Sequence, residues 1–208
     1  MPTFVDGPTV TLHAFAVAHP WLTPVVIGVT AAFIFLCPIW FVFMGVWERR
    51  LRPGVAALLG LGLTQWASHE VGKLVYQPRP FVVMRFTPLY PHPPNNSFPS
   101  TLTAFAAVAG VIAVLAWRRR GLVLVLGTGV VAVGCVYVGV HYVSDVSVGA
   151  ALGAACAAAT WWVVGLPPVT RALSAVERRI PGRRRSHGAA ATNPRPREVV
   201  EFLQQRVD

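Results

Sequence analysis

The stretch TPVVIGVTAAFIFLCPIWFVFMGVW, residues 23–47, is followed directly by the charged run Glu-Arg-Arg-Leu-Arg at positions 48–52. It contains no charged residue and exceeds the roughly 20 residues that a helix needs to cross the hydrocarbon core of a bilayer. Because unsatisfied backbone groups are costly in lipid, such a stretch crosses as a helix. It therefore predicts a transmembrane helix that ends at a basic cluster.

The composition of the whole chain agrees with a membrane protein. Hydrophobic residues make up 54% of the 208 residues and charged residues 12%, with a mean hydropathy of +0.56. A soluble domain carries roughly 25% charged residues. The net charge of +10 lies in clusters between apolar runs and in the tail, which suits membrane topology and not a nucleic-acid groove. The three cysteines lie inside apolar segments without CxxC spacing, so we interpret them as buried apolar residues.

Four further stretches are long and apolar enough to suggest spans, and they are residues 54–76, 100–117, 121–140 and 146–166. The sequence therefore predicts an all-α transmembrane bundle of about five to six helices, in a membrane-embedded domain at 23–168. Residues 1–22 lack a basic n-region, so we expect an interfacial segment and no cleaved signal peptide. Residues 169–208 form a basic tail, expected to be partly disordered, with a short interfacial helix at 173–180.

The orientation follows from the distribution of lysine and arginine. Fifteen of the 18 basic residues follow the first, third and fifth predicted spans, and three lie in the other connections. The positive-inside rule places the larger set, tail included, in the cytoplasm. We expect a multi-pass protein of a bacterial plasma membrane, with its functional face outside.

Polar residues gather at the predicted outer ends of the helices, although ionisable groups normally avoid membrane depth. Lys73 and Arg79 are cations near the outer end of the second span. Ser100, followed by Thr101, stands where the third span begins, and the dipole and free N–H groups of a helix N-terminus attract anions. These residues predict a phosphate-binding site.

His141 and Asp145 lie four residues apart at another outer end, so on a continuing helical turn they share a face. A carboxylate bonded to one imidazole nitrogen fixes the tautomer and leaves the other nitrogen as a nucleophile. Each residue also has a structural interpretation: a snorkelling Lys73, a capping Ser100, a structural His–Asp hydrogen bond. Their occurrence on one side of the membrane favours a functional site.

These segments resemble the three signature motifs of the type-2 phosphatidic acid phosphatases, membrane relatives of the vanadium haloperoxidases. The sequences Arg79-Pro80-Phe81 and NSFPS (residues 96–100) are similar to motifs of the bacitracin-resistance type of undecaprenyl diphosphate phosphatase. The resemblance covers roughly residues 23–166. The matching positions are Lys73, Arg79-Pro80, Pro99-Ser100 and His141 with Asp145.

The resemblance implies a role for each matching residue. His141 would attack phosphorus to give a phosphohistidine, and Asp145 would orient it. Lys73, Arg79, Ser100 and Thr101 would bind the substrate phosphate. No metal or other cofactor is implied, and the expected substrate is a phosphate or diphosphate lipid of the outer leaflet, with polyprenyl diphosphate favoured.

Three positions depart from the family pattern. Leu102 occupies the position of the second-motif histidine, Cys135 that of the third-motif arginine, and Lys73 is one residue closer to Arg79 than usual. Leucine transfers no proton, and losing a general acid costs about 10²- to 10⁴-fold in rate. His92, in the outer loop, is the candidate substitute acid.

Two functions therefore remain open. The first is a divergent lipid-phosphate phosphatase. The second is a catalytically impaired relative that binds lipid phosphate or scaffolds a cell-envelope complex. The expected partners are the bilayer and a lipid, and not nucleic acid. A homodimer and a complex with another envelope enzyme are the protein assemblies we consider.

Overall fold

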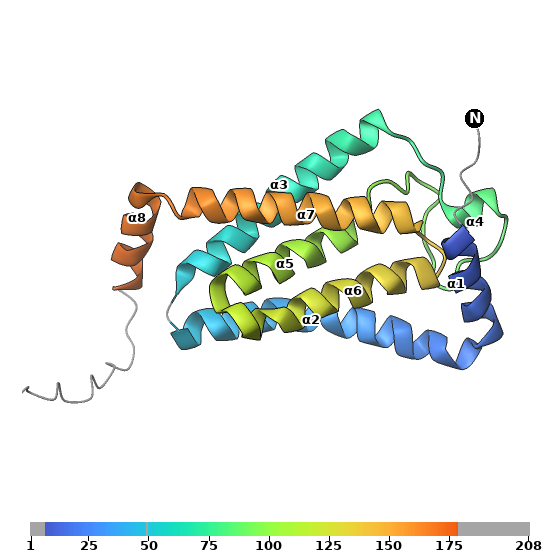
Figure 1. The fold of residues 1–208 in the computed structure, drawn as a ribbon, viewed down its shortest axis with the longest axis horizontal. Coiled ribbons are helices and arrows are strands. Elements are labelled where there is room, and N and C mark those ends of the chain that lie inside the picture. Colours follow the sequence, from blue (N-terminus) through green and yellow to red (C-terminus); the bar gives the residue numbers. More distant parts are fainter. Residues whose placement is uncertain (1–6, 49, 179–208) are drawn as a thin grey trace, which may run out of the picture. The chain divides into compact units, whose positions relative to one another are not determined.

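In a computed structural model of the protein, residues 7–48 and 50–178 have a described structure. The chain divides into two units, Met1–Glu177 and Arg178–Asp208. The second unit lies outside the described residues apart from Arg178, and most of the predicted basic tail lies there with it. The first unit carries all the helices described below (Figure 1).

The described part of the chain is helical and contains no strand, only an isolated bridge between Pro78 and Asn96. The prediction of an all-α bundle is confirmed. The elements are α1 (Gly7–Ala18), η1 (Pro20–Leu22), α2 (Thr23–Glu48), α3 (Leu51–Leu74), α4 (Pro80–Val83), α5 (Thr101–Trp117), η2 (Arg118–Gly121), α6 (Leu122–Tyr137), α7 (Val143–Val164) and α8 (Pro167–Glu177).

Five long helices, α2, α3, α5, α6 and α7, lie close to the predicted ranges. By length and apolar composition, however, three helical stretches in the described part of the chain qualify as membrane spans: Pro20–Glu48, Thr101–Tyr137 and Val143–Val164. The second of them includes α5, η2 and α6, and Figure 1 shows the chain reversing direction between α5 and α6. Helix α3 lies close to its predicted range but does not qualify by this measure, because its last third carries several polar residues.

Helix α5 lies inside the bundle and packs against α3, α6 and α7 (Figure 1). Its contact with α7 is close because α7 presents glycines there. A Cβ atom added to Gly149 would lie 2.4 Å from the Ser100 carbonyl oxygen, and one added to Gly153 would lie 2.1 Å from the Ala104 oxygen. The expected close approach of small-residue helices is thus present, and it fixes the start of α5 against the start of α7.

The basic clusters and the predicted site residues lie at opposite ends of the bundle. The C-terminal ends of α2, α5 and α7 lie together at one end, and the α6–α7 connection lies at the other with α1 and α4 (Figure 1). At the basic end, Trp117 Nε1 donates to Glu48 Oε2 at 2.9 Å, and Arg52 lies over the Trp161 ring at 4.1 Å. This arrangement matches the alternation of charge on which the predicted topology depends.

The two flanking helices are both tied to the bundle. In α1, His13 Nδ1 lies 3.2 Å from the Tyr137 carbonyl oxygen, and its ring stacks on Phe86 with centroids 3.9 Å apart. The segment predicted to be interfacial therefore packs on the site end of the bundle. Helix α8 begins before the predicted interfacial helix, and its Glu177 carboxylate accepts a 2.7 Å hydrogen bond from the Leu51 amide at the start of α3.

Candidate active site

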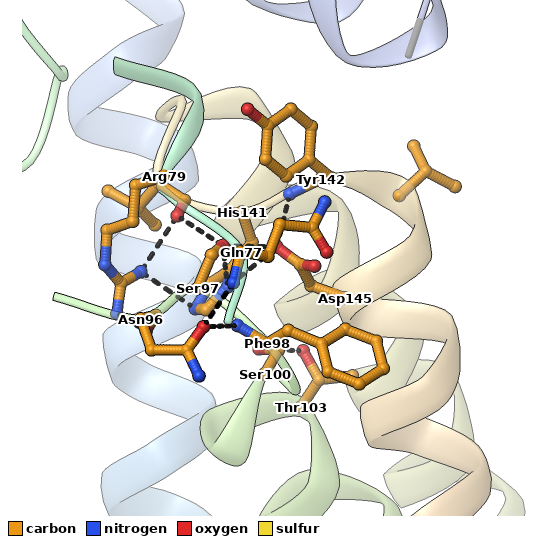
Figure 2. A network of polar contacts seen from close by, with 12 residues as sticks. Gln77, Arg79, Asn96, Ser97, Phe98, Ser100, Thr103, His141, Tyr142 and Asp145 are labelled. Carbon is orange, nitrogen blue, oxygen red and sulfur yellow. Dashed lines mark hydrogen bonds and ion pairs between the residues drawn. The ribbon is translucent and has the colours of Figure 1, made fainter. Parts of the chain in front are cut away.

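Most of the predicted site residues come together where three connections meet the first turns of α5 and α7. The connections are the segment between α3 and α4, the long loop between α4 and α5, and the short loop between α6 and α7 (Figure 2). Arg79, Ser97, His141 and Asp145 are all buried there. Buried polar groups are normally hydrogen-bonded, and these four side chains contact one another, although Asp145 Oδ1 has no hydrogen-bond partner among the described residues.

His141 and Asp145 form the predicted pair, although not on one continuous helix. Helix α7 begins at Val143, so His141 lies in the loop before it and Asp145 in its first turn. The Asp145 Oδ2 atom lies 3.4 Å from His141 Nδ1 and accepts a 2.8 Å hydrogen bond from the Tyr142 amide. An acidic residue in the first turn of a helix satisfies a free N–H group and suits the helix dipole. Asp145 therefore caps the N-terminus of α7, and the same oxygen lies beside the His141 imidazole and orients it.

Ser97 lies between the two members of this pair (Figure 2). Its hydroxyl donates a short hydrogen bond to Asp145 Oδ2 and lies 3.3 Å from His141 Nδ1. Sequence reasoning did not identify Ser97 as a site residue, because its role depends on the loop carrying it against α7. The only signal was its place within the NSFPS run at 96–100.

Arg79 lies on the opposite edge of the imidazole. Its Nη1 atom donates to the Val140 carbonyl oxygen at 2.8 Å and lies 3.4 Å from His141 Nε2 (Figure 2). A guanidinium group has donors and no acceptor. The contact therefore assigns Nε2 as an acceptor and places the proton on Nδ1, facing Asp145 and Ser97. A nucleophilic nitrogen next to a fixed cation is suited to attack on an anionic group.

Asn95 and Asn96 hold Arg79 in place. Asn95 Oδ1 accepts from Arg79 Nε at 2.9 Å, and the Asn96 carbonyl oxygen lies 3.3 Å from Nη2. The Asn96 side chain also donates to the Gly72 carbonyl oxygen at 2.8 Å and accepts from the Gln77 amide at 2.9 Å. This asparagine, which sequence reasoning also missed, joins the end of α3 to the loop that carries Ser97.

Ser100 and Thr101 begin α5 as predicted, with Ser100 at the N-cap position. The Ser100 hydroxyl is fully buried and lies 3.1 Å from Thr103 Oγ1, and the Ser100 amide donates to the Asp145 carbonyl oxygen at 3.1 Å. In this structure the hydroxyl faces Thr103 within the bundle. Its backbone nevertheless joins the start of α5 to the start of α7 beside His141.

Lys73 does not join the others. Its Nζ atom donates to Glu70 Oε1 at 2.8 Å, and its side chain is 55% exposed in the last turn of α3. In Figure 1 this end of α3 diverges from the start of α7. Of the two predicted phosphate-binding cations, the structure brings Arg79 to His141, and it pairs Lys73 with an acidic neighbour on its own helix.

His92 lies beside His141. Their ring centroids are 6.4 Å apart with an edge-to-face angle of 71°, and His92 Nδ1 lies 3.1 Å from the Pro93 carbonyl oxygen. Burial lowers the pKa of His92, and the positive charge of Arg79 lowers it further, while the bond to the Pro93 carbonyl opposes both effects. The loop histidine is therefore part of the same charged environment.

Two of the three departures from the family pattern concern α5 and α6. Leu102 is 36% exposed on the first turn of α5. Cys135 is buried in α6. In the described part of the chain, no group of three or more His, Cys, Asp or Glu side chains is placed to hold a metal ion.

Comparisons with known proteins agree with this architecture. The sequence profile of the PAP2 superfamily matches residues 53–166. The crystal structure of Aquifex aeolicus LpxE is similar with a TM-score of 0.58 at 23% identity, over 68% of this chain and 86% of that one. The crystal structure of a transmembrane PAP2 type phosphatidylglycerolphosphate phosphatase from Bacillus subtilis is similar with a TM-score of 0.58 at 25% identity, over 77% and 87%. The search of curated proteins gives no significant match.

Proposed function

Because this chain belongs to the PAP2 superfamily, we propose that it is a membrane lipid-phosphate phosphatase that acts through a phosphohistidine at His141. The observation that carries the proposal is the position of His141, with Asp145 at Nδ1 and Arg79 at Nε2. The carboxylate stabilises the charge that the imidazole gains when Nε2 attacks. The guanidinium stabilises the negative charge of the phosphoryl group that Nε2 attacks.

The chemistry proceeds in two displacements. The Nε2 lone pair of His141 forms a bond to phosphorus, and the bond from phosphorus to the leaving oxygen breaks. Water then attacks the phosphohistidine, the P–N bond breaks with its electron pair returning to Nε2, and inorganic phosphate leaves. The Asp145 carboxylate lies beside Nδ1 through both steps, and its charge offsets the positive charge that the imidazole gains.

The site suits a lipid substrate. It lies at one end of a helical bundle whose α2, α5–α6 and α7 segments are long and apolar enough to span a membrane. A lipid can keep its chains in hydrocarbon while its phosphate reaches Arg79. The similarity to a phosphatidylglycerolphosphate phosphatase supports a lipid phosphate as substrate. The amino-acid sequences around Arg79 and Ser97 favour, as the substrate, a polyprenyl diphosphate in the outer leaflet of a bacterial plasma membrane.

Leu102 and Cys135 favour a second candidate, a relative that binds lipid phosphate without turnover. A purified preparation in detergent, supplied with undecaprenyl diphosphate or phosphatidic acid, separates the two functions. We expect phosphate release that is lost in His141→Ala and reduced by roughly 10²-fold or more in Asp145→Asn, since the amide cannot hold the Nδ1–H tautomer in the same way. Saturable lipid binding with no phosphate release at high protein concentration would support the binding protein.

A further inference from the structure

The proposed reaction needs a proton donor for the leaving oxygen, and Leu102 supplies none at the position where the family pattern has a histidine. We propose that His92, from the loop between α4 and α5, is the general acid for the leaving group and the general base for the water that follows. The inference rests on the proposed function and names a catalytic residue for it.

The distance between the two rings supports this role. A nucleophile lies about 3 Å from the atom that it attacks in a near-attack geometry. A general acid lies about 3 Å from the atom that it protonates. With ring centroids 6.4 Å apart, the two imidazoles are close enough to contact the same bound phosphoryl group, one at phosphorus and the other at the leaving oxygen.

The bond to Pro93 orients the His92 ring. A carbonyl oxygen only accepts, so the 3.1 Å contact places a proton on Nδ1 and leaves Nε2 as the nitrogen that gains or loses the second proton. The other histidines in the described part of the chain are engaged elsewhere or exposed. His13 is bonded to the Tyr137 carbonyl, His19 to that of Phe15, and His69 lies exposed on α3.

The electrostatic environment changes when substrate arrives. Arg79 and His141 lower the pKa of His92 in the free protein, after the larger effect of burial. The negative charge of a bound phosphate acts in the opposite direction and favours the imidazolium. His92 therefore gains its proton most readily when there is a phosphate ester to cleave.

The proton balance is complete without another group. In the first step His141 Nε2 attacks phosphorus, the P–O bond breaks, and the leaving oxygen takes the proton from His92 Nε2. In the second step water attacks phosphorus and gives a proton to His92 Nε2, which restores the imidazolium. The P–N bond breaks, and His141 regains its lone pair.

The test compares substrates with two different leaving groups in the variant His92→Gln. Glutamine keeps much of the side-chain volume and cannot donate or accept a proton as an acid or base. Dioctanoyl phosphatidate releases a poor alkoxide, whereas p-nitrophenyl phosphate releases a stable phenolate. We expect about a 10²-fold or larger loss of kcat on the phosphatidate. On p-nitrophenyl phosphate we expect an initial burst of nitrophenolate equal to the enzyme concentration, followed by slow turnover and accumulation of phosphohistidine.

The pH profile gives an independent readout. The acid must be protonated in the free enzyme, so kcat/KM of the wild type falls as the pH rises through the His92 pKa, which lies below its ordinary value of 6.5. This fall is absent in His92→Gln. The matched control is His19→Gln, because His19 bonds the Phe15 carbonyl of its own segment. We expect this variant to keep the wild-type rates on both substrates and the wild-type pH profile.

Each outcome decides between the proposals. The role of His92 is overturned, and the phosphatase is left intact, by absence of the nitrophenolate burst, by no loss of kcat on the phosphatidate, or by persistence of the fall above the His92 pKa. A wild-type protein that releases phosphate from none of the substrates overturns both. Gel filtration and thermal melting of His92→Gln, matched to wild type, separate these results from loss of folding.

Discussion

Ser97 donates its hydroxyl hydrogen to Asp145 Oδ2 and lies 3.3 Å from His141 Nδ1, so a neutral side chain joins the imidazole to its carboxylate. The Asp145 oxygen also accepts from the Tyr142 amide, and the carboxylate therefore keeps its position at the start of α7. Ser97 comes from a different connection than His141. Its bond couples the loop after α4 to the orientation of the nucleophile.

Replacing Ser97 with alanine is expected to lower kcat by roughly 10- to 100-fold, since a buried hydrogen bond to a charged group contributes about 1.5–3 kcal/mol. KM should stay close to wild type, because Ser97 contacts the imidazole and carboxylate and lies behind the nitrogen that attacks. Steady-state kinetics on phosphatidic acid measures both constants. Ser147→Ala, which removes an exposed hydroxyl bonded to the Val143 carbonyl, is the matched control. A large rise in KM with unchanged kcat would contradict the positioning role.

Arg79 and Lys73 are expected to differ in their contributions. Arg79→Lys keeps a positive charge but loses the planar fork that reaches Val140 and His141 together, so we expect a loss of roughly 10²-fold or more in kcat/KM. Lys73→Gln is expected to lose less than 10-fold, since Lys73 pairs with Glu70 and is half exposed. Parallel measurements of kcat/KM on one lipid substrate compare the two. Equal losses would indicate that Lys73 swings to the phosphate when substrate binds.

The helices were predictable because lipid demands long apolar segments, and α2, α5, α6 and α7 meet that demand within a few residues. The His141–Asp145 pair was predictable because two chemically complementary residues stand four apart. Ser97 and Asn96 were not, because their roles depend on how an irregular loop folds back on α3 and α7. Lys73 lies apart from the cluster for a local reason: Glu70, three residues earlier on the same helix, is its ion-pair partner.

The contact between α5 and α7 gives a prediction on stability. Gly153→Ala is expected to lower the melting temperature in detergent by several degrees, because the new Cβ would lie 2.1 Å from the Ala104 carbonyl oxygen and force the helices apart. Gly129→Ala on α6 is the matched control, since no atom lies within 4 Å of its added Cβ and alanine favours the helix. Thermal unfolding followed by circular dichroism measures both variants. A Gly153→Ala protein as stable as Gly129→Ala would mean that α5 and α7 do not pack this closely.

Leu102 offers a test by gain of function. Its side chain is 36% exposed on the first turn of α5, so a histidine fits there without disturbing the core. The first turn of α5 also begins beside Ser100, whose amide bonds the Asp145 carbonyl next to His141. If proton transfer limits turnover, Leu102→His should raise kcat by about 10-fold or more on a substrate with a poor leaving group.

Leu102→His should have its larger effect in the His92→Gln background, because the new histidine then supplies the proton donor that the His92 substitution has removed. Assays of the single and double variants on dioctanoyl phosphatidate, with p-nitrophenyl phosphate as the less demanding substrate, measure this rescue. Leu102→Gln, similar in polarity and size but unable to exchange a proton, is the control and should rescue neither variant. A rescue by glutamine would show that polarity at position 102 is what matters, and no rescue by histidine would place position 102 beyond reach of the leaving oxygen.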